Sequence, residues 1–345
     1  MRFNIKNIAR KNILALQPYS SARDEFTGEA SVFLDANENP FNAPYNRYPD
    51  PRQLALKTQI GQLKGIPIEN IFLGNGSDEP IDLLFRAFCE PGVDHVVSIA
   101  PTYGMYRVAA GINDITFREV LLNEDFTLDA SRVLSAIDVH TKLIFLCSPN
   151  NPTGNALDHK QILQIIGNFN GLVILDEAYI DFCPKKTLLA DLNKYPNLVI
   201  LQTLSKAWGL AGIRLGMAFA SKEIIDLLSK IKYPYNINLL TQHKALEMLQ
   251  STDAKEKWVE TILINKTILI NKLQNLPNVV RIYPSDANFV LVKTTAARKI
   301  YDALVARQII VRDRSKVELC GEALRITVGT AEENRMLIDA MKEVG

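Results

Sequence analysis

The 345-residue sequence has few of the side chains that build metal centres or disulfide frameworks. Its four cysteines are scattered along the chain at Cys89, Cys147, Cys183 and Cys320. No CxxC pair occurs, and none of the four histidines stands at metal-ligand spacing from another. We therefore expect neither a zinc cluster nor a disulfide framework, and we expect the reducing cytoplasm as the compartment.

The sequence also lacks an excess of charge and a long apolar run. Lys and Arg total 39 and Asp and Glu total 38, which leaves a net charge of +1. Such a balance provides no strong field to attract nucleic acid or an anionic membrane. No apolar run approaches the ~18 residues of a membrane span. We therefore expect no nucleic-acid or membrane partner, and a chain with 47% hydrophobic residues can build a large core.

Short apolar runs alternate with helix-length segments through the middle of the chain. The runs are rich in Val, Ile and Leu and span residues 95–100, 142–147, 172–175 and 198–201. Runs without alternating polarity are typical of strands buried on both faces of a parallel sheet. Their separation, roughly 25–45 residues, suits βαβ units. The sequence therefore predicts an α/β fold with a mostly parallel sheet flanked by helices.

The last third of the chain has a different pattern. Residues 296–308 have helical periodicity and lead into strand candidates at 309–312 and 324–328. A capping-box pattern at 330–333 predicts the start of a final helix. The long charged stretch 252–274 is predicted to be a helix that connects two domains. Isolated strands mixed with helices favour a smaller α+β domain here.

These patterns divide the chain into three parts. Residues 1–45 are predicted to form an N-terminal arm and the start of the small domain. The basic, amphipathic beginning of this segment would also fit a transit peptide, but motif-like sequence begins soon after it, which favours an arm. No apolar signal-peptide core is visible. Residues 46–240 are predicted to form the large domain, and residues 241–345 the small C-terminal domain.

Three polar side chains follow successive apolar runs. Asn151, Asp176 and Lys206 each stand a few residues beyond one of these runs. Because ligands of open parallel sheets bind outside the carboxyl ends of the strands, we expect these side chains on one rim. A carboxylate and an amine at such positions are costly to bury unless something pairs with them.

One cofactor, pyridoxal 5'-phosphate, would use all of these groups. Lys206 can bond covalently to its aldehyde as the catalytic residue, and Asp176 can pair with its protonated ring nitrogen. Asn151 and Tyr179 can donate hydrogen bonds to its phenolic oxygen, and Tyr103 can stack on the ring. A protonated ring withdraws electrons from a carbanion on the substrate, so the pattern predicts pyridoxal-phosphate chemistry.

The cofactor phosphate needs a separate binding site. The glycine-rich turn 74–79, which contains Ser77 and Asp78, precedes an apolar helix candidate. A turn that opens into a helix offers free backbone N–H groups and the positive end of the helix dipole. Ser205 adds a hydroxyl, and Arg214 adds a fork of donors that suits phosphate. Each feature alone also fits an ordinary turn or surface residue; their combination favours the cofactor site.

Three motifs give the chain a resemblance to a known family. They are NNPTG at 150–154, DEAY at 176–179 and SKAWGLAGIRLG at 205–216. Together they resemble the fold-type-I pyridoxal-phosphate aminotransferases. The resemblance implies a large domain with a sheet of the seven-stranded type. It also implies a homodimer with shared active sites, in which Tyr48 reaches the cofactor phosphate of the partner subunit.

Within that superfamily, the chain resembles the histidinol-phosphate aminotransferase family over nearly its whole length. The supporting segments are LQPY at 16–19, LDANENP at 34–40, RYPDP at 47–51 and LRITVGT at 324–330. The implied reaction converts L-histidinol phosphate and 2-oxoglutarate to imidazole acetol phosphate and L-glutamate. The resemblance implies that Arg325 holds the acidic end of the substrate and that Arg312 assists. It also implies that Tyr19 and Asn37 lie on an arm that folds over the site.

Other functions remain open at this point. An aromatic amino acid aminotransferase or a threonine-phosphate decarboxylase would share the fold and the cofactor motifs. A non-catalytic pyridoxal-phosphate-binding regulator is disfavoured, because the sequence has no basic face or appended DNA-binding module. A nicotinamide-dependent enzyme is also disfavoured, because no GxGxxG motif follows an early strand.

Overall fold

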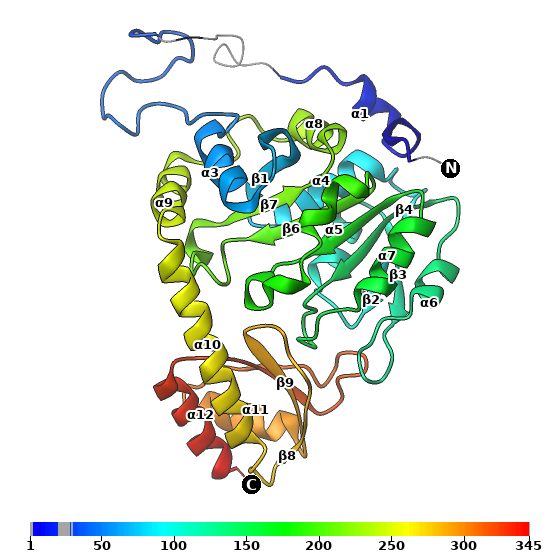
Figure 1. Ribbon diagram of the computed structural model, residues 1–345, viewed down its shortest axis with the longest axis vertical. Helices are drawn as coiled ribbons and strands as arrows, with labels where there is room; N and C mark the ends of the chain where they lie inside the picture. The colour runs from blue at the N-terminus through cyan, green and yellow to red at the C-terminus, as the bar shows by residue number, and fades with distance from the viewer. Residues whose placement is uncertain (1–2, 20–27, 29, 345) are drawn as a thin grey trace.

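The computed structural model describes residues 3–19, 28 and 30–344, and it contains two β-sheets, of which the smaller lies below the larger in Figure 1. The strands of the larger sheet are β1 (Ile71–Asn75), β2 (His95–Ala100), β3 (Thr116–Leu121), β4 (Thr141–Cys147), β5 (Leu172–Asp176), β6 (Leu198–Thr203) and β7 (Leu215–Phe219). Those of the smaller sheet are β8 (Val279–Ile282), β9 (Phe289–Thr294), β10 (Arg312–Asp313) and β11 (Ala323–Thr327).

The larger sheet confirms the predicted α/β fold class. Its strand order is β1-β7-β6-β5-β4-β2-β3, and only β7 runs antiparallel to its neighbours. Successive residues of β4 pack on opposite faces: Ile144 joins one core cluster and Phe145 joins the other. Burial on both faces explains why these strands have continuous apolar sequences instead of alternating ones.

Helices cover both faces of the larger sheet. One face is covered by α3 (Leu54–Lys64), α6 (Ala130–Ser135), α7 (His159–Asn168) and α9 (Leu239–Leu249). The other face is covered by α4 (Asp78–Phe88), α5 (Met105–Ile112) and α8 (Lys222–Ile231). Short 3₁₀ helices occur at Ile5–Asn7, Ile68–Asn70, Ile180–Phe182, Pro184–Lys186, Leu189–Lys194 and Ala211–Ile213.

The smaller sheet is antiparallel, with the order β10-β11-β9-β8. Its core includes residues of α10 (Thr252–Leu273), α11 (Ala297–Ala306) and α12 (Ala331–Lys342). In Figure 1, α10 runs from the larger domain to the smaller one, as the sequence predicts. The predicted capping box is also present: Thr330 accepts from the Glu333 N–H, and the Glu333 side chain accepts from the Thr330 N–H.

One predicted strand is shorter than expected. The sequence predicts a strand at 309–312, but only Arg312 and Asp313 pair with β11. The reason is local, because the Ile309 N–H still donates to Leu304 O at the end of α11 (2.9 Å). The preceding residue, Gln308, has a φ of 61°, which turns the chain out of the helix.

The beginning of the chain packs against the larger sheet's helices. Helix α1 (Lys11–Ala15) lies near α8, where the Lys230 Nζ donates to Leu14 O at 2.8 Å. The Arg10 N–H donates to Ala87 O at the end of α4 (2.9 Å). We retain the three-part division of the chain as a proposal, although its boundary at residue 240 passes through α9, whose Ala245 and Leu249 pack in the larger core.

Within the described segments, no helix combines the length and the apolar character that crossing a membrane requires.

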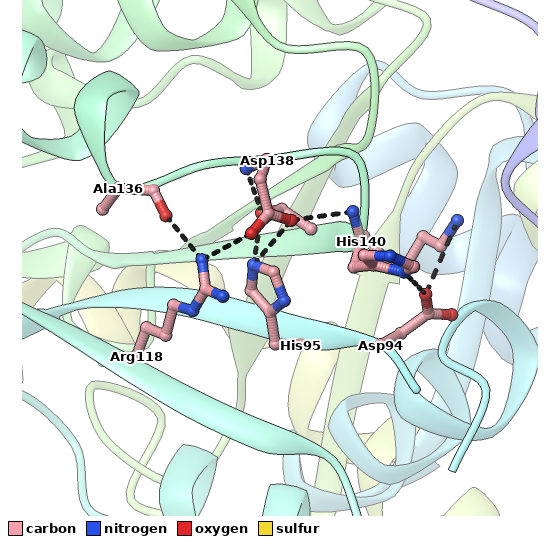
Figure 2. Close-up of polar contacts among 8 residues, drawn as sticks. Asp94, His95, Arg118, Ala136, Asp138 and His140 are labelled. Atoms are coloured by element: carbon pink, nitrogen blue, oxygen red, sulfur yellow. Dashed lines mark hydrogen bonds and ion pairs between the residues drawn. The ribbon is translucent and has the colours of Figure 1, made fainter. Parts of the chain in front are cut away.

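The amino ends of β2 and β4 carry a network of charged side chains (Figure 2). His95 Nε2 lies 2.6 Å from Thr141 Oγ1 and 3.4 Å from Asp138 Oδ1. The other carboxylate oxygen of Asp138 accepts from Arg118 Nη1 at 2.9 Å. Arg118 and His95 therefore both face the Asp138 carboxylate, so the polar groups of this network find their partners within the protein.

Candidate active site

A cavity of about 820 Å³ lies at the opposite edge, beyond the carboxyl ends of the parallel strands and beside the smaller sheet. Ala100, Cys147, Asp176 and Thr203, which end β2, β4, β5 and β6, all line it. The predicted site residues that also line it are Ser77, Asp78, Tyr103, Asn151, Tyr179, Ser205, Lys206, Arg214, Arg312 and Arg325. The fold therefore brings residues that are far apart in the sequence to one rim.

Asp176 is the most deeply buried charged group of this rim, with an exposed fraction of 2%. Its Oδ2 accepts from the Tyr106 hydroxyl at 2.6 Å, and its Oδ1 accepts from the Ala178 N–H at 3.0 Å. Burial raises the pKa of Asp176, and these two neutral donors oppose the rise. No cation among the described residues lies within 4.0 Å of the carboxylate. This arrangement suits a carboxylate whose counterion is supplied by a ligand.

Lys206 lies in the tight loop between β6 and β7. The loop is held by bonds from the Leu204 N–H to Leu215 O (3.1 Å) and from the Gly209 N–H to Lys206 O (3.1 Å). Lys206 Nζ lies 5.4 Å from the centre of the Tyr179 ring. Desolvation and then the charge of Arg325 lower the pKa of Lys206, while Asp176 opposes this effect. A lysine that releases its proton more readily is a better nucleophile.

Arg325 and Asn151 join the two domains across the cavity. Arg325 Nη1, from β11, donates to Asn151 Oδ1, which follows β4, at 2.5 Å. Because the amide oxygen of Asn151 accepts this bond, its NH₂ group is left to donate to a ligand. The Arg325 guanidinium also lies 5.4 Å from the Phe289 ring centre. Tyr179 packs edge-on against the same ring, with centroids 5.1 Å apart.

The start of α4 forms a compact backbone turn against the β6–β7 loop. Gly76 has a φ of +67°, and its N–H donates to Arg214 O at 2.8 Å. A Cβ on Gly76 would lie only 2.5 Å from Arg214 Nη2, so a side chain here would displace that guanidinium. The first N–H groups of a helix have no partners within it, and they attract anions. Ser77 and Ser205 lie on the same cavity wall.

The side chain of Asp78 has a different role from that of its backbone. Its Oδ2 lies 3.4 Å from Arg214 Nη2, and its Oδ1 accepts from the Tyr103 hydroxyl at 3.1 Å. A carboxylate would repel a phosphate, so only the backbone N–H of Asp78 could bind one directly. The side chain instead orients Arg214 and Tyr103 at the mouth of this turn.

Comparison with known proteins places the chain among the aminotransferases. A family model described as aminotransferase class I and II matches residues 31–341. The histidinol-phosphate aminotransferase of Parabacteroides distasonis is 57% identical to the chain and covers 99% of both sequences. That of Bacteroides fragilis is 56% identical over 98% of this chain and 99% of its own length. The chain belongs to the histidinol-phosphate aminotransferase family.

Solved structures of other proteins have the same fold as this aminotransferase. The histidinol-phosphate aminotransferase of Sinorhizobium meliloti, solved in complex with pyridoxal 5'-phosphate, matches with a TM-score of 0.81. The match covers 90% of this chain and 89% of that one at 24% sequence identity. The fold-type-I architecture expected from the sequence motifs is thus confirmed.

Three predicted residues of the aminotransferase lie outside the main cavity. Tyr19 follows α1 and is 74% exposed. Asn37 and Tyr48 line a second cavity of about 550 Å³ beside the beginning of α9. Tyr48 stacks on Tyr235 there, with ring centroids 4.4 Å apart. Within one protomer, the fold therefore does not bring these side chains to the cavity that contains Lys206.

The sequence reasoning also missed two residues of the site. Tyr106, which donates to Asp176, is fully buried on α5 and stacks on Phe145 with ring centroids 4.8 Å apart. Helical periodicity offered no signal for Tyr106, because Tyr103 precedes α5, which begins at Met105. Arg314 lines the cavity with Arg312, and their two-residue spacing in a strand was the available signal.

Proposed function

We propose that this aminotransferase binds pyridoxal 5'-phosphate in the cavity at the carboxyl edge of the larger sheet. The buried Asp176 is the observation that carries the proposal, because no cation of the described residues lies within 4.0 Å of its carboxylate and a protonated ring nitrogen would supply one. Lys206 would hold the cofactor covalently through Nζ. The phosphate would lie at the start of α4 beside Gly76, where the first N–H groups of the helix have no partners within it.

The remaining groups of the cavity would fix the ring. Asn151 and Tyr179 would donate hydrogen bonds to its phenolic oxygen, and Tyr103 would stack on its face. Ser77, Ser205 and Arg214 would add donors to the phosphate, together with the backbone N–H of Asp78. All of these side chains line the same cavity as Lys206, which supports one shared ligand for them.

The proposed reaction is reversible amino transfer from L-histidinol phosphate to 2-oxoglutarate, which yields imidazole acetol phosphate and L-glutamate. Two observations support this substrate: the full-length similarity to relatives named for it, and the arginines on the cavity wall. A substrate with a phosphate dianion needs clustered cations, and guanidinium forks match phosphate geometry. We place the reaction in histidine biosynthesis and in the cytoplasm.

The bound cofactor would supply an electron sink for negative charge at the substrate carbon that carries the amine. Lys206, whose pKa is lowered by desolvation, would remove the proton from that carbon as general base and return it. Asp176 would stay ionised against the ring nitrogen. Arg325, braced by Asn151, would hold the acidic end of the substrate, with Arg312 beside it.

We also propose a homodimer in which each protomer completes the other's site. Tyr48 is half-exposed and lies apart from its own protomer's cavity, and we assign it to the cofactor phosphate of a partner subunit, as the family resemblance implies. Tyr19 and Asn37 would reach the substrate from the N-terminal segment. Two measurements test this arrangement: the oligomeric state of the protein, and the activity of a mixture of the Tyr48→Phe and Lys206→Ala variants. Activity in the mixture above that of either variant alone supports shared sites, and no gain in activity rejects them.

Donor competition tests the proposed substrate. Equal concentrations of L-histidinol phosphate, L-phenylalanine and L-tyrosine are offered with 2-oxoglutarate as acceptor, and each keto product is measured. The account expects imidazole acetol phosphate to dominate. Dominant aromatic keto acids would replace the proposal with an aromatic aminotransferase. O-Phospho-L-threonine is offered in a parallel assay, and we expect it to release no carbon dioxide. Release of carbon dioxide would indicate a decarboxylase.

A further inference from the structure

Three arginines share one face of the smaller sheet. Arg312 of β10 lies directly opposite Arg325 of β11 in the antiparallel register. The pairing continues one step further, where the Arg314 N–H donates to Ala323 O at 2.9 Å. Alternate residues of a strand point to the same face, so Arg314 lies on the face of Arg312. All three arginines line the cavity that contains Lys206.

No acid at ion-pair distance neutralises Arg314 in the part of the chain that the structure describes. Asp313 belongs to the opposite face of β10, where its carboxylate accepts from the Ser315 N–H (2.8 Å) and hydroxyl. Glu318 lines the cavity as well, but it forms no ion pair within 4.0 Å with any of the three arginines.

The guanidinium of Arg314 is also incompletely hydrogen-bonded. Its Nε is buried and has no hydrogen-bond partner among residues 3–19, 28 and 30–344. Desolvation, followed by the charges of Arg325 and Arg312, lowers the pKa of Arg314 to about 10, so the group is still charged at neutral pH. A buried donor without an acceptor and a cation beside two others both destabilise the free protein. An anionic ligand in the cavity would relieve both.

We propose that Arg314 binds the substrate phosphate and selects phosphorylated amines over amino acids. This inference rests on the proposed function, since it assigns a residue to the substrate end of the same cavity. It concerns a side chain that neither the sequence motifs nor the reaction scheme uses.

The chemistry of the two anions explains the selection. A phosphate monoester carries a charge of about −1.5 to −2 at neutral pH and three acceptor oxygens. A carboxylate carries one charge and two oxygens, which a single guanidinium fork can satisfy. The phosphorus of L-histidinol phosphate is also two bonds further from the amine-bearing carbon than a carboxylate carbon would be. Arg325 can therefore bind either anion, whereas Arg314 gains a hydrogen-bond acceptor only from the phosphate.

The test removes the arginine and the phosphate separately. Arg314→Gln is assayed with L-histidinol phosphate, with the unphosphorylated L-histidinol and with L-glutamate. We expect kcat/KM for L-histidinol phosphate to fall about 10- to 100-fold, mainly through KM, because a charge-assisted hydrogen bond is lost. For the other two donors we expect a change below about threefold, since neither presents a third acceptor to the residue. Arg314→Lys, which keeps the charge but not the fork, should give an intermediate loss.

Lys316→Gln is the matched control, because Lys316 is an exposed cation two residues further on that does not line the cavity. It should change none of the three values, and thermal unfolding should show that all variants fold. Equal losses with all three donors, or no loss with any, would overturn the inference.

A second readout separates this inference from the proposed function. Inorganic phosphate is titrated as an inhibitor of the glutamate reaction of the holoenzyme. Arg314→Gln should weaken this inhibition about tenfold, consistent with a lost charge-assisted hydrogen bond. If the wild type rejects L-histidinol phosphate but phosphate inhibition still depends on Arg314, the proposed substrate is wrong and the role of Arg314 stands. Unchanged inhibition in the variant contradicts that role.

Discussion

The two edges of the larger sheet hold their charges in opposite ways. At the amino edge, Asp138 lies between His95 and Arg118, and each charge has its counterpart within the network (Figure 2). At the carboxyl edge, the hydrogen-bond donors of Asp176 are neutral, and the charge of Arg325 contributes to the lowered pKa of Lys206. The first edge is complete without a ligand, whereas the second gathers charges that a ligand would balance.

This contrast indicates how the fold separates stability from chemistry. Removing a charge from the amino edge breaks contacts within the protein and should change stability. Removing a charge from the carboxyl edge should change catalysis instead, because the charge that would pair with it belongs to a bound ligand.

Lys206→Ala should lower turnover by at least about 10⁴-fold, because it removes both the covalent anchor and the general base. Steady-state kinetics measure the loss, and circular dichroism checks that the variant folds. Asp138→Asn at the amino edge is the comparison variant, and its turnover should equal that of the wild type. Near-normal activity in Lys206→Ala would end the proposed mechanism.

Asp176→Asn should lower turnover by about 10²-fold or more, since an uncharged amide cannot keep the ring nitrogen protonated. The rate of the first half-reaction with L-histidinol phosphate measures this effect. Glu177→Gln is the control, because Glu177 is equally buried but bonds to Thr187 and Gln202, away from the cavity. It should affect stability more than rate, and equal rate losses in both variants would argue against a specific role for Asp176.

Tyr106→Phe should lower turnover about tenfold, because it deletes a buried hydrogen bond to the Asp176 carboxylate. The same change removes an influence that lowers the pKa of Asp176, so that pKa should rise. Since Asp176 acts as a carboxylate, the acidic limb of the pH–rate profile should move to higher pH. A profile that keeps its shape while the rate drops would assign Tyr106 to packing alone.

Replacing His95 should change the stability of the protein and its pH dependence without changing turnover. Burial and then the charge of Arg118 hold the pKa of His95 below its ordinary value of about 6.5. The unfolded chain therefore binds this proton first as the pH falls. The stability that the neutral His95 contributes is complete above the ordinary pKa. It is lost as the pH falls through that value toward the lower pKa of His95 in the folded protein. Urea unfolding at several pH values should show a shallower acid loss in His95→Gln than in the wild type.

The sequence predicts the fold and the rim of the site well for a physical reason. Strands buried on both faces, such as 172–176, need continuous apolar residues, and the side chains just beyond them must meet at one edge. Asn151, Asp176 and Lys206 could therefore be placed without knowing any tertiary contact. The capping box at Thr330 is likewise a local signal.

Other features depend on pairing that the sequence does not state. The cavity-facing position of Arg314 follows from the register of β10 with β11, which is set by long-range hydrogen bonds. Tyr106 reaches Asp176 only because α5 packs beside β5 in the core. Tyr48 lies in a segment with no regular element, so its neighbours cannot be derived from periodicity.

Reduction of the holoenzyme with borohydride, followed by peptide mapping, tests the central claim most directly. Borohydride makes the bond between the cofactor and its lysine permanent, so the labelled peptide identifies the anchor. The account predicts a single label on the peptide that contains Lys206. A label on another lysine, or no pyridoxyl label on a protein that still catalyses amino transfer, would contradict it.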